Sequence, residues 1–160
     1  MLNVTIICLG KLKEDYWREA ASEYTKRLGA YCKLTLIQLE PERLSDNPSD
    51  AQTAAALACE AAAIKAKIPT GAKVFSLCIE GKQLSSEQLA EKINAAGISG
   101  SSKIVFIIGS SFGLSDEIKG ISDEKLSFSS MTFPHQLARI MLLEQLYRAF
   151  QINSGGKYHK

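Results

Sequence analysis

The sequence predicts one α/β domain over residues 1–160, built on a mainly parallel sheet with helices on both faces. Its length suits a single compact domain, and 46% of its residues are hydrophobic, as in an average globular protein. Segments with strand-like patterns alternate along the chain with segments of helical periodicity. The run Ile104–Ile108 is apolar throughout, which is typical of a central strand covered by helices on both sides.

Each predicted element follows from a local signal. The first strand precedes a segment in which large apolar side chains recur at helical spacing. The second strand runs into the polar connection 40–48, which we expect to be mobile. The next two helices begin at capping boxes, Ser49 with Gln52 and Ser85 with Gln88. In chain order, the predicted elements are strand 2–9, helix 14–31, strand 34–39, helix 49–68, strand 74–79, helix 85–95, strand 104–108, strand 126–128 and helix 134–152.

Composition and charge narrow the class of protein. The opening apolar stretch lacks a basic region, and no segment approaches the roughly 20 apolar residues that span a bilayer, so we expect a cytoplasmic protein without a membrane segment. Cys8, Cys32, Cys59 and Cys78 are scattered without a CxxC pair. We therefore expect no metal site and expect each thiol to be a small buried side chain. The net charge is only +2, so any contact with RNA must be local.

Two loops follow strands whose carboxyl ends share one edge of the predicted sheet, where open parallel sheets bind ligands. The loop Gly109–Leu114 carries glycines that permit a tight turn and close approach of the backbone to a ligand. It matches neither a dinucleotide-binding fingerprint nor a phosphate-binding P-loop. The alternative is a plain connection between a strand and a helix.

The second loop, Ser129–His135, carries hydroxyl groups and a proline at the start of the last helix. The free backbone donors of a helix N-terminus suit the polar edge of a nucleoside or a carboxylate. The alternative is that Thr132 merely caps the helix and that His135 only packs against it.

The last helix is apolar around more of its circumference than one core-facing stripe requires. One face would pack on the sheet, and the other would meet a second subunit in an isologous homodimer. The competing explanation is a helix buried centrally within a monomer.

Short motifs at strand ends, in the last helix and at the C-terminus form a combined pattern over the whole chain. They are Leu9–Lys11, Leu77, Ile79, Gly81–Lys82, Ile108–Gly109, Gly113–Leu114, Leu126–His135, Arg139, Glu144, Tyr147–Ala149 and Tyr158–His159. This pattern resembles that of the ribosomal RNA large subunit methyltransferase H family of the SPOUT superfamily. The resemblance implies a C-terminal trefoil knot, which periodicity cannot reveal because knots are rare in proteins.

The resemblance also implies an activity and its partners. Such proteins are homodimers that use S-adenosylmethionine, without a metal, to methylate N3 of a pseudouridine in 23S ribosomal RNA on the assembled ribosome. Ser110 stands where the family commonly has a second glycine, so Gly109 is expected to make the closer backbone contact. The cofactor contacts carried over are Leu77, Gly109, Ser110, Ser129, Ser130, Met131, Thr132, Phe133 and Pro134.

The target nitrogen must lose its proton before or during attack on the methyl carbon, which requires a general base. His159 is the candidate because its unperturbed pKa lies near neutrality, and Tyr158 would orient or stack on the target base. Arg148 would stabilise negative charge on the pyrimidine. The alternatives are a surface ion pair between Glu144 and Arg148 and a frayed terminus at residues 158–159.

Two other classes of function remain open. One is a non-catalytic nucleotide-binding or ribosome-associated dimeric module, and the other is a structural dimerisation domain. We expect the chain to have little length to spare for a separate RNA-binding domain. An enzyme of this size would therefore choose its target through the dimer surface and the shape of the ribosome, with Lys and Arg side chains contacting phosphates.

Overall fold

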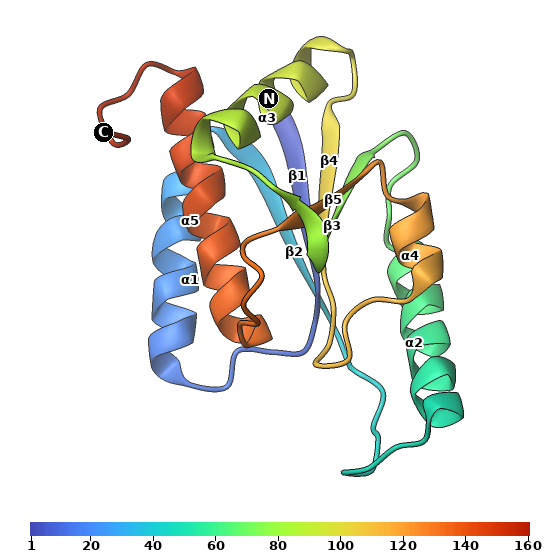
Figure 1. The fold of residues 1–160 in the computed structure, drawn as a ribbon. Helices are drawn as coiled ribbons and strands as arrows, with labels where there is room; N and C mark the ends of the chain where they lie inside the picture. The colour runs from blue at the N-terminus through green and yellow to red at the C-terminus, as the bar shows by residue number, and fades with distance from the viewer.

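Five parallel strands form the central sheet of the computed structural model, which describes residues 1–160 (Figure 1). Their order across the sheet is β2-β1-β4-β3-β5, so the N-terminal strands lie at one end and β5 lies at the other. Every pairing is parallel, as the sequence predicts. The strands are β1 (Leu2–Leu9), β2 (Cys32–Leu39), β3 (Lys73–Gln83), β4 (Lys103–Ile108) and β5 (Glu124–Ser127).

Helices cover both faces of the sheet, which explains why β4 is apolar along its whole length. One face carries α1 (Asp15–Leu28), α3 (Ser86–Ile98) and α5 (His135–Asn153), whose buried side chains share the larger of two hydrophobic clusters. The other face carries α2 (Asp50–Lys65) and α4 (Asp116–Ile121), which pack on the smaller cluster. The sheet therefore separates two cores, and its carboxyl edge lies between both layers of helices.

Capping boxes start two of the helices where the sequence predicts them. Ser49 accepts a hydrogen bond from the backbone N–H of Gln52, whose side chain accepts one from the backbone N–H of Ser49. Ser85 and Gln88 repeat this arrangement at the start of α3. These reciprocal bonds satisfy backbone donors that the first helical turn leaves free.

The boundaries of several predicted elements need correction. The short helix α4 was not predicted, although Ser115 caps it by accepting from the backbone N–H of Ile118. β3 continues past Glu80 to Gln83, and β5 covers 124–127 instead of 126–128. β3 is longer because its end pairs with Leu126 and Ser127, and β5 begins earlier because residues 124–125 pair with residues 75–76.

The last helix, α5, lies between α1 and α3 and contacts both of them on the same face of the sheet. Leu142, Leu143, Leu146 and Ala149 are almost fully buried within the single chain. The central placement thus accounts for much of the apolar circumference that the sequence analysis assigned to a second subunit. The homodimer stays a prediction on this evidence.

The end of β3 bends around β5. Leu126 pairs with Leu77 before the bend and with Lys82 after it. Gly81 lies so close to Leu126 that an added Cβ would be 2.6–2.8 Å from its backbone atoms, which only glycine avoids. The trefoil knot that the family resemblance implies stays a prediction.

The structure also bears on the predictions about membrane segments and about the cysteines. No helix has the length and apolar character needed to span a membrane. Cys8 and Cys32 are buried as expected, but Cys59 is exposed and Cys78 is partly exposed, so the expectation of four buried thiols is wrong. Cys59 lies at a solvent-facing position of α2, where the helix does not contact the sheet.

Candidate functional site

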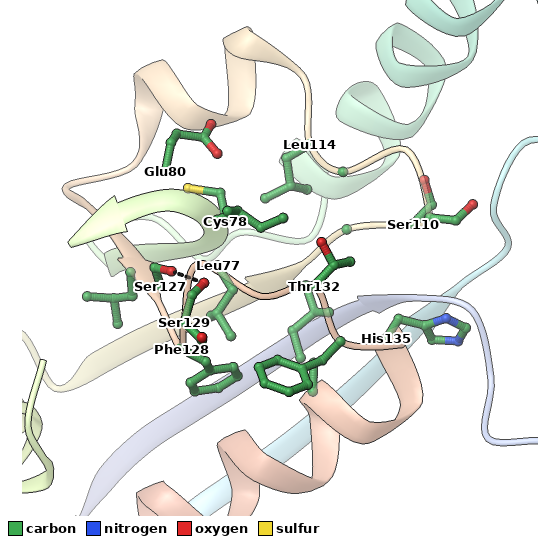
Figure 2. A pocket seen from close by; sticks show the side chains of 18 of the residues that line it. Leu77, Cys78, Glu80, Ser110, Leu114, Ser127, Phe128, Ser129, Thr132 and His135 are labelled. Atoms are coloured by element: carbon green, nitrogen blue, oxygen red, sulfur yellow. Dashed lines mark hydrogen bonds between the residues drawn. The ribbon is translucent and has the colours of Figure 1, made fainter. Parts of the chain in front are cut away.

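A cavity of about 780 Å³ opens at the carboxyl ends of β3, β4 and β5 (Figure 2). Its walls come from residues 77–80, 108–114, 126–129 and 131–135, with Lys119 and Ala138 completing it. Parallel sheets place the ends of neighbouring strands together at one edge, so three separate connections meet here. All of the predicted cofactor residues line this cavity except Ser130.

The loop after β4 is held in a tight turn. The backbone N–H of Gly113 donates to the carbonyl of Ser110 at 2.9 Å, and Gly113 has a φ of +81°. A Cβ on Gly109 would lie 2.4 Å from the carbonyl oxygen of Gly113, so the turn closes only over a glycine. Ser110 has no positive φ and its hydroxyl donates to Glu60 at 3.0 Å, so the serine fits the position that the family commonly gives to glycine.

The loop between β5 and α5 is organised by serines. Ser127 donates its hydroxyl hydrogen to the carbonyl of Ser129, and the hydroxyl of Ser129 accepts from the backbone N–H of Met131. The N-cap of α5 is Pro134 and has no side-chain cap, so the interpretation of Thr132 as a cap is wrong. Thr132 lines the cavity instead, beside a helix terminus whose backbone donors have no capping side chain (Figure 2).

His135 lies at the edge of the cavity and packs against the backbone of the loop after β1. A Cβ on Gly10 would lie 2.8 Å from Nε2 of His135, so the missing side chain of Gly10 makes room for the imidazole. Burial lowers the pKa of His135 below its usual value, and the charge of Arg139 lowers it further. The imidazole is therefore neutral at neutral pH, and its buried Nε2 has no hydrogen-bond partner.

An ion pair stands at another part of the cavity wall. Lys119 on α4 lies with its Nζ 2.5 Å from Oε1 of Glu80, and both side chains line the cavity. The hydrogen bond from Lys119 lowers the pKa of Glu80, and the same bond raises the pKa of Lys119. Sequence reasoning missed Lys119 because it missed α4, although Ser115 followed by two acidic residues is a readable helix start.

The cavity also contains residues that the sequence analysis did not give as cofactor contacts. Some lie in the predicted motifs, namely Ile79, Ile108, Gly113, Leu114, Leu126, Ser127, Phe128 and His135, and Ser111 and Phe112 lie in the predicted loop 109–114. The lining residues that lie in no predicted motif or loop are Cys78, Glu80, Lys119 and Ala138. For Cys78 and Glu80, the only signal was their position at the carboxyl edge of the sheet.

The three predicted catalytic residues form a cluster elsewhere, which we call the tail cluster: Arg148, Tyr158 and His159. The guanidinium of Arg148 lies 4.7 Å from the ring centre of Tyr158 and 3.2 Å from Nδ1 of His159. Arg148 is thirteen residues beyond His135, and a rise of about 1.5 Å per residue places it about 20 Å farther along α5. The structure therefore brings the three residues together but does not bring them to the cavity of their own chain.

Glu144 and Glu87 hold the tail cluster in place. Arg148 donates to Glu144 at 2.6 Å, so the predicted ion pair is present, and Tyr158 donates to the same carboxylate at 3.1 Å. Nε2 of His159 lies 2.7 Å from Glu87 on α3. Burial is the largest cause that raises the pKa of Tyr158 to about 12. The interpretation of these last residues as a frayed terminus is wrong.

Comparisons with known proteins agree with this architecture. A family profile described as "Predicted SPOUT methyltransferase" matches residues 2–159. A ribosomal RNA large subunit methyltransferase H from Clostridium novyi (strain NT) is 48% identical over 159 residues, covering 99% of this chain and 100% of that protein. A protein of the same name from Bifidobacterium adolescentis is 50% identical over 159 residues, with the same coverage of both chains.

A solved structure also shares the fold. It is that of a probable methylase family protein from Haemophilus influenzae Rd KW20, with a TM-score of 0.59 and 15% sequence identity. The match covers 99% of this chain and 71% of the other. The profile and the full-length relatives extend the resemblance that the strand-end motifs indicate, and the chain belongs to the SPOUT methyltransferases, in the family of the ribosomal RNA large subunit methyltransferases H.

Proposed function

We propose that this protein transfers the methyl group of S-adenosylmethionine to N3 of a pseudouridine in 23S ribosomal RNA, on the assembled ribosome. The observation that carries the proposal is the cavity, whose walls contain nearly all of the residues that the family resemblance implies for cofactor binding. Two relatives of the full length of this chain are named for methylation of large-subunit ribosomal RNA. Ribosomes that contain 23S RNA lie in the cytoplasm, so we place the enzyme there.

The cavity fits the methyl donor in size and chemistry. Its volume lies within the range of about 300–1,000 Å³ that small-molecule sites occupy. Leu77, Gly109, Ser110 and the loop 129–134 would hold the cofactor between apolar side chains and backbone polar groups. When bound, S-adenosylmethionine supplies an electrophilic methyl carbon attached to a positively charged sulfur.

The catalytic groups would come from a second subunit. The tail cluster lies about 20 Å along α5 from the cavity of its own chain, as the rise of a helix dictates. A residue must lie within hydrogen-bond reach of the proton that it removes, so this cluster cannot serve the cavity of the same chain in this arrangement. An isologous homodimer provides two equivalent sites, each with one chain's cavity and its partner's tail.

Within such a site, each member of the tail cluster has a separate task. His159 accepts the N3 proton of the pseudouridine, which frees the nitrogen lone pair for attack on the methyl carbon. Arg148 stabilises the negative charge that develops on the pyrimidine ring. Tyr158 keeps its proton because its pKa is about 12, and its ring stacks on or orients the target base.

The transferase activity is tested with tritiated S-adenosylmethionine and ribosomes that lack this methyl group. We expect label in large-subunit RNA, and digestion to nucleosides should release N3-methylpseudouridine. Naked 23S RNA should be a far poorer substrate, because the ribosome's shape selects the target. Equal rates of methyl transfer to naked RNA and to ribosomes would contradict selection by the shape of the ribosome. No transfer to either substrate would contradict the proposed methyltransferase activity.

A variant separates catalysis from cofactor binding. His159→Asn should lower the rate of methyl transfer by about 100-fold or more, which is the usual contribution of a general base. Its affinity for S-adenosylmethionine, measured by calorimetry, should equal that of the unmodified protein. Cofactor binding by the unmodified protein without any methyl transfer would indicate the non-catalytic module, and no binding would indicate a structural dimerisation domain.

A further inference from the structure

Glu60 is the one carboxylate in the chain that is buried, with 5% of its surface exposed. It lies in α2, outside the cavity wall, and no Lys, Arg or His forms an ion pair with it. A buried carboxylate without a cation must be held by hydrogen bonds, because burial removes its hydration. Its neighbours therefore show what holds it and what it holds.

The two oxygens of Glu60 bind two different loops. Oε1 accepts from the hydroxyl of Ser110 at 3.0 Å, and Oε2 accepts from the backbone N–H of Glu42 at 2.9 Å. Ser110 belongs to the glycine turn of the cavity, which Figure 2 shows at one end of the site. Glu42 belongs to the connection between β2 and α2, which contains no helix or strand of its own. One side chain thus joins a cofactor loop to a peripheral loop.

We infer that Glu60 is a positioning residue that fixes the glycine turn through Ser110 and couples cofactor binding to the loop around Glu42. This inference rests on the proposed function, because it assumes that the cavity binds S-adenosylmethionine. A site for a small molecule needs its backbone groups held to a fraction of an ångström by a second layer of hydrogen bonds. A carboxylate offers two acceptor oxygens, whereas an amide offers one oxygen and an NH₂ group, so Glu60 accepts from both loops at once and a glutamine would not.

Because Glu60 binds both loops, their mobility should change together. When a ligand immobilises the glycine turn, Ser110 and Glu60 lose freedom together, and the amide of Glu42 opens less often. Removing the hydroxyl of Ser110 should therefore uncouple the two loops, and replacing the carboxylate of Glu60 should weaken the attachment of both. A purely structural role for Glu60 would change global stability without this local coupling.

Calorimetry with S-adenosylmethionine on the full chain tests the positioning role. Glu60→Gln and Ser110→Ala should each lower the affinity for S-adenosylmethionine by about 3- to 10-fold. The double variant should bind about as well as the single variant with the lower affinity, because the effects of coupled residues are not additive. Ser110→Thr, which keeps a hydroxyl, should restore most of the affinity. The matched control is Glu117→Gln, which removes an exposed carboxylate of α4 that pairs with Lys65 and should leave binding unchanged.

Hydrogen exchange at the amide of Glu42 tests the coupling. The cofactor should slow this exchange in the unmodified protein and in Ser110→Thr, and it should have no such effect in Ser110→Ala. Binding by the unmodified protein with unchanged affinity in both Glu60→Gln and Ser110→Ala would overturn the inference, as would additive losses or a Glu42 amide that ignores the cofactor. Absence of binding by the unmodified protein would instead remove the proposed function on which the inference rests.

Discussion

Single residues determine how closely the segments of the site approach one another. Gly81 lets the end of β3 bend against Leu126, and Gly109 lets its turn close on Gly113. The sequence shows that these residues are glycines, and the family resemblance marks both positions. It cannot show which backbone each one touches, because those contacts join residues far apart in the chain.

Replacing Gly81 by alanine should lower the free energy of unfolding by about 1–3 kcal/mol, the usual cost of overpacking. The reason is the clash of the new Cβ with the backbone of Leu126, which cannot rotate away. Urea unfolding followed by circular dichroism measures the change.

Gly97→Ala is the matched control for that experiment. Gly97 lies within α3, and an added Cβ there meets no atom within 4 Å. Because alanine favours the helix by roughly 0.5–1 kcal/mol over glycine, this variant should be more stable than the unmodified protein. A loss of stability in Gly97→Ala as large as that in Gly81→Ala would remove the role assigned to the Leu126 contact.

His135 should make the stability of the protein depend on pH. The pKa of His135 is lowered in the folded protein, so between the folded and the unfolded pKa the unfolded chain is protonated at this residue and the folded chain is not. The contribution is fully present above the unfolded pKa of about 6.5 and is lost as pH falls from there through the folded pKa. Urea unfolding between pH 7.5 and 5 should show this loss, and His135→Asn should flatten the curve. An equal slope in both proteins would show that other groups dominate.

Whole elements were predictable where their signals are local. Both capping boxes and the apolar run of β4 lie within a few neighbouring residues, and the structure confirms them. α4 escaped because its six residues are too few to show a helical period. The end of β3 and the start of β5 escaped because they are set by pairing of residues 82–83 with 126–127 and of residues 124–125 with 75–76, which no local pattern contains.

The N-cap of α4, Ser115, should contribute measurably to the stability of the protein. Ser115→Ala should destabilise the protein by about 0.5–2 kcal/mol, because the backbone N–H of Ile118 loses its acceptor at the first turn. Because α4 carries Lys119, the variant should also weaken cofactor binding measured by calorimetry. Ser45→Ala, an exposed serine in the 40–48 connection, serves as the control. If Ser115→Ala were as stable as the unmodified protein, tertiary packing alone would hold α4.

The molecule as a whole separates the cavity at the carboxyl edge of the sheet from the tail cluster. Sequence reasoning placed the cavity correctly because parallel strands must bring their carboxyl ends together. It gave no distance between the cavity and Arg148, because that separation depends on the direction of α5 across the sheet. It also assigned the outer face of α5 to a partner, whereas α1 and α3 flank this helix within the chain.

Mixed dimers test whether the tail serves the partner's cavity. Gly109→Val should block the cavity, because even a Cβ there collides with Gly113, and His159→Asn removes the proposed base. Each variant alone should be almost inactive. Unfolding them together and refolding should restore about a quarter of the activity, since half of the dimers are mixed and each has one intact site. An inactive mixture would show that each cavity uses its own tail.

The bend of β3 around Leu126 also has a consequence for biosynthesis. β5 and α5 belong to the last quarter of the chain, yet Leu126 must lie against both Leu77 and Lys82. A nascent polypeptide therefore cannot finish the cavity while its C-terminal quarter is still being made. Contacts between such distant residues form slowly, so maturation of this protein should lag behind its translation.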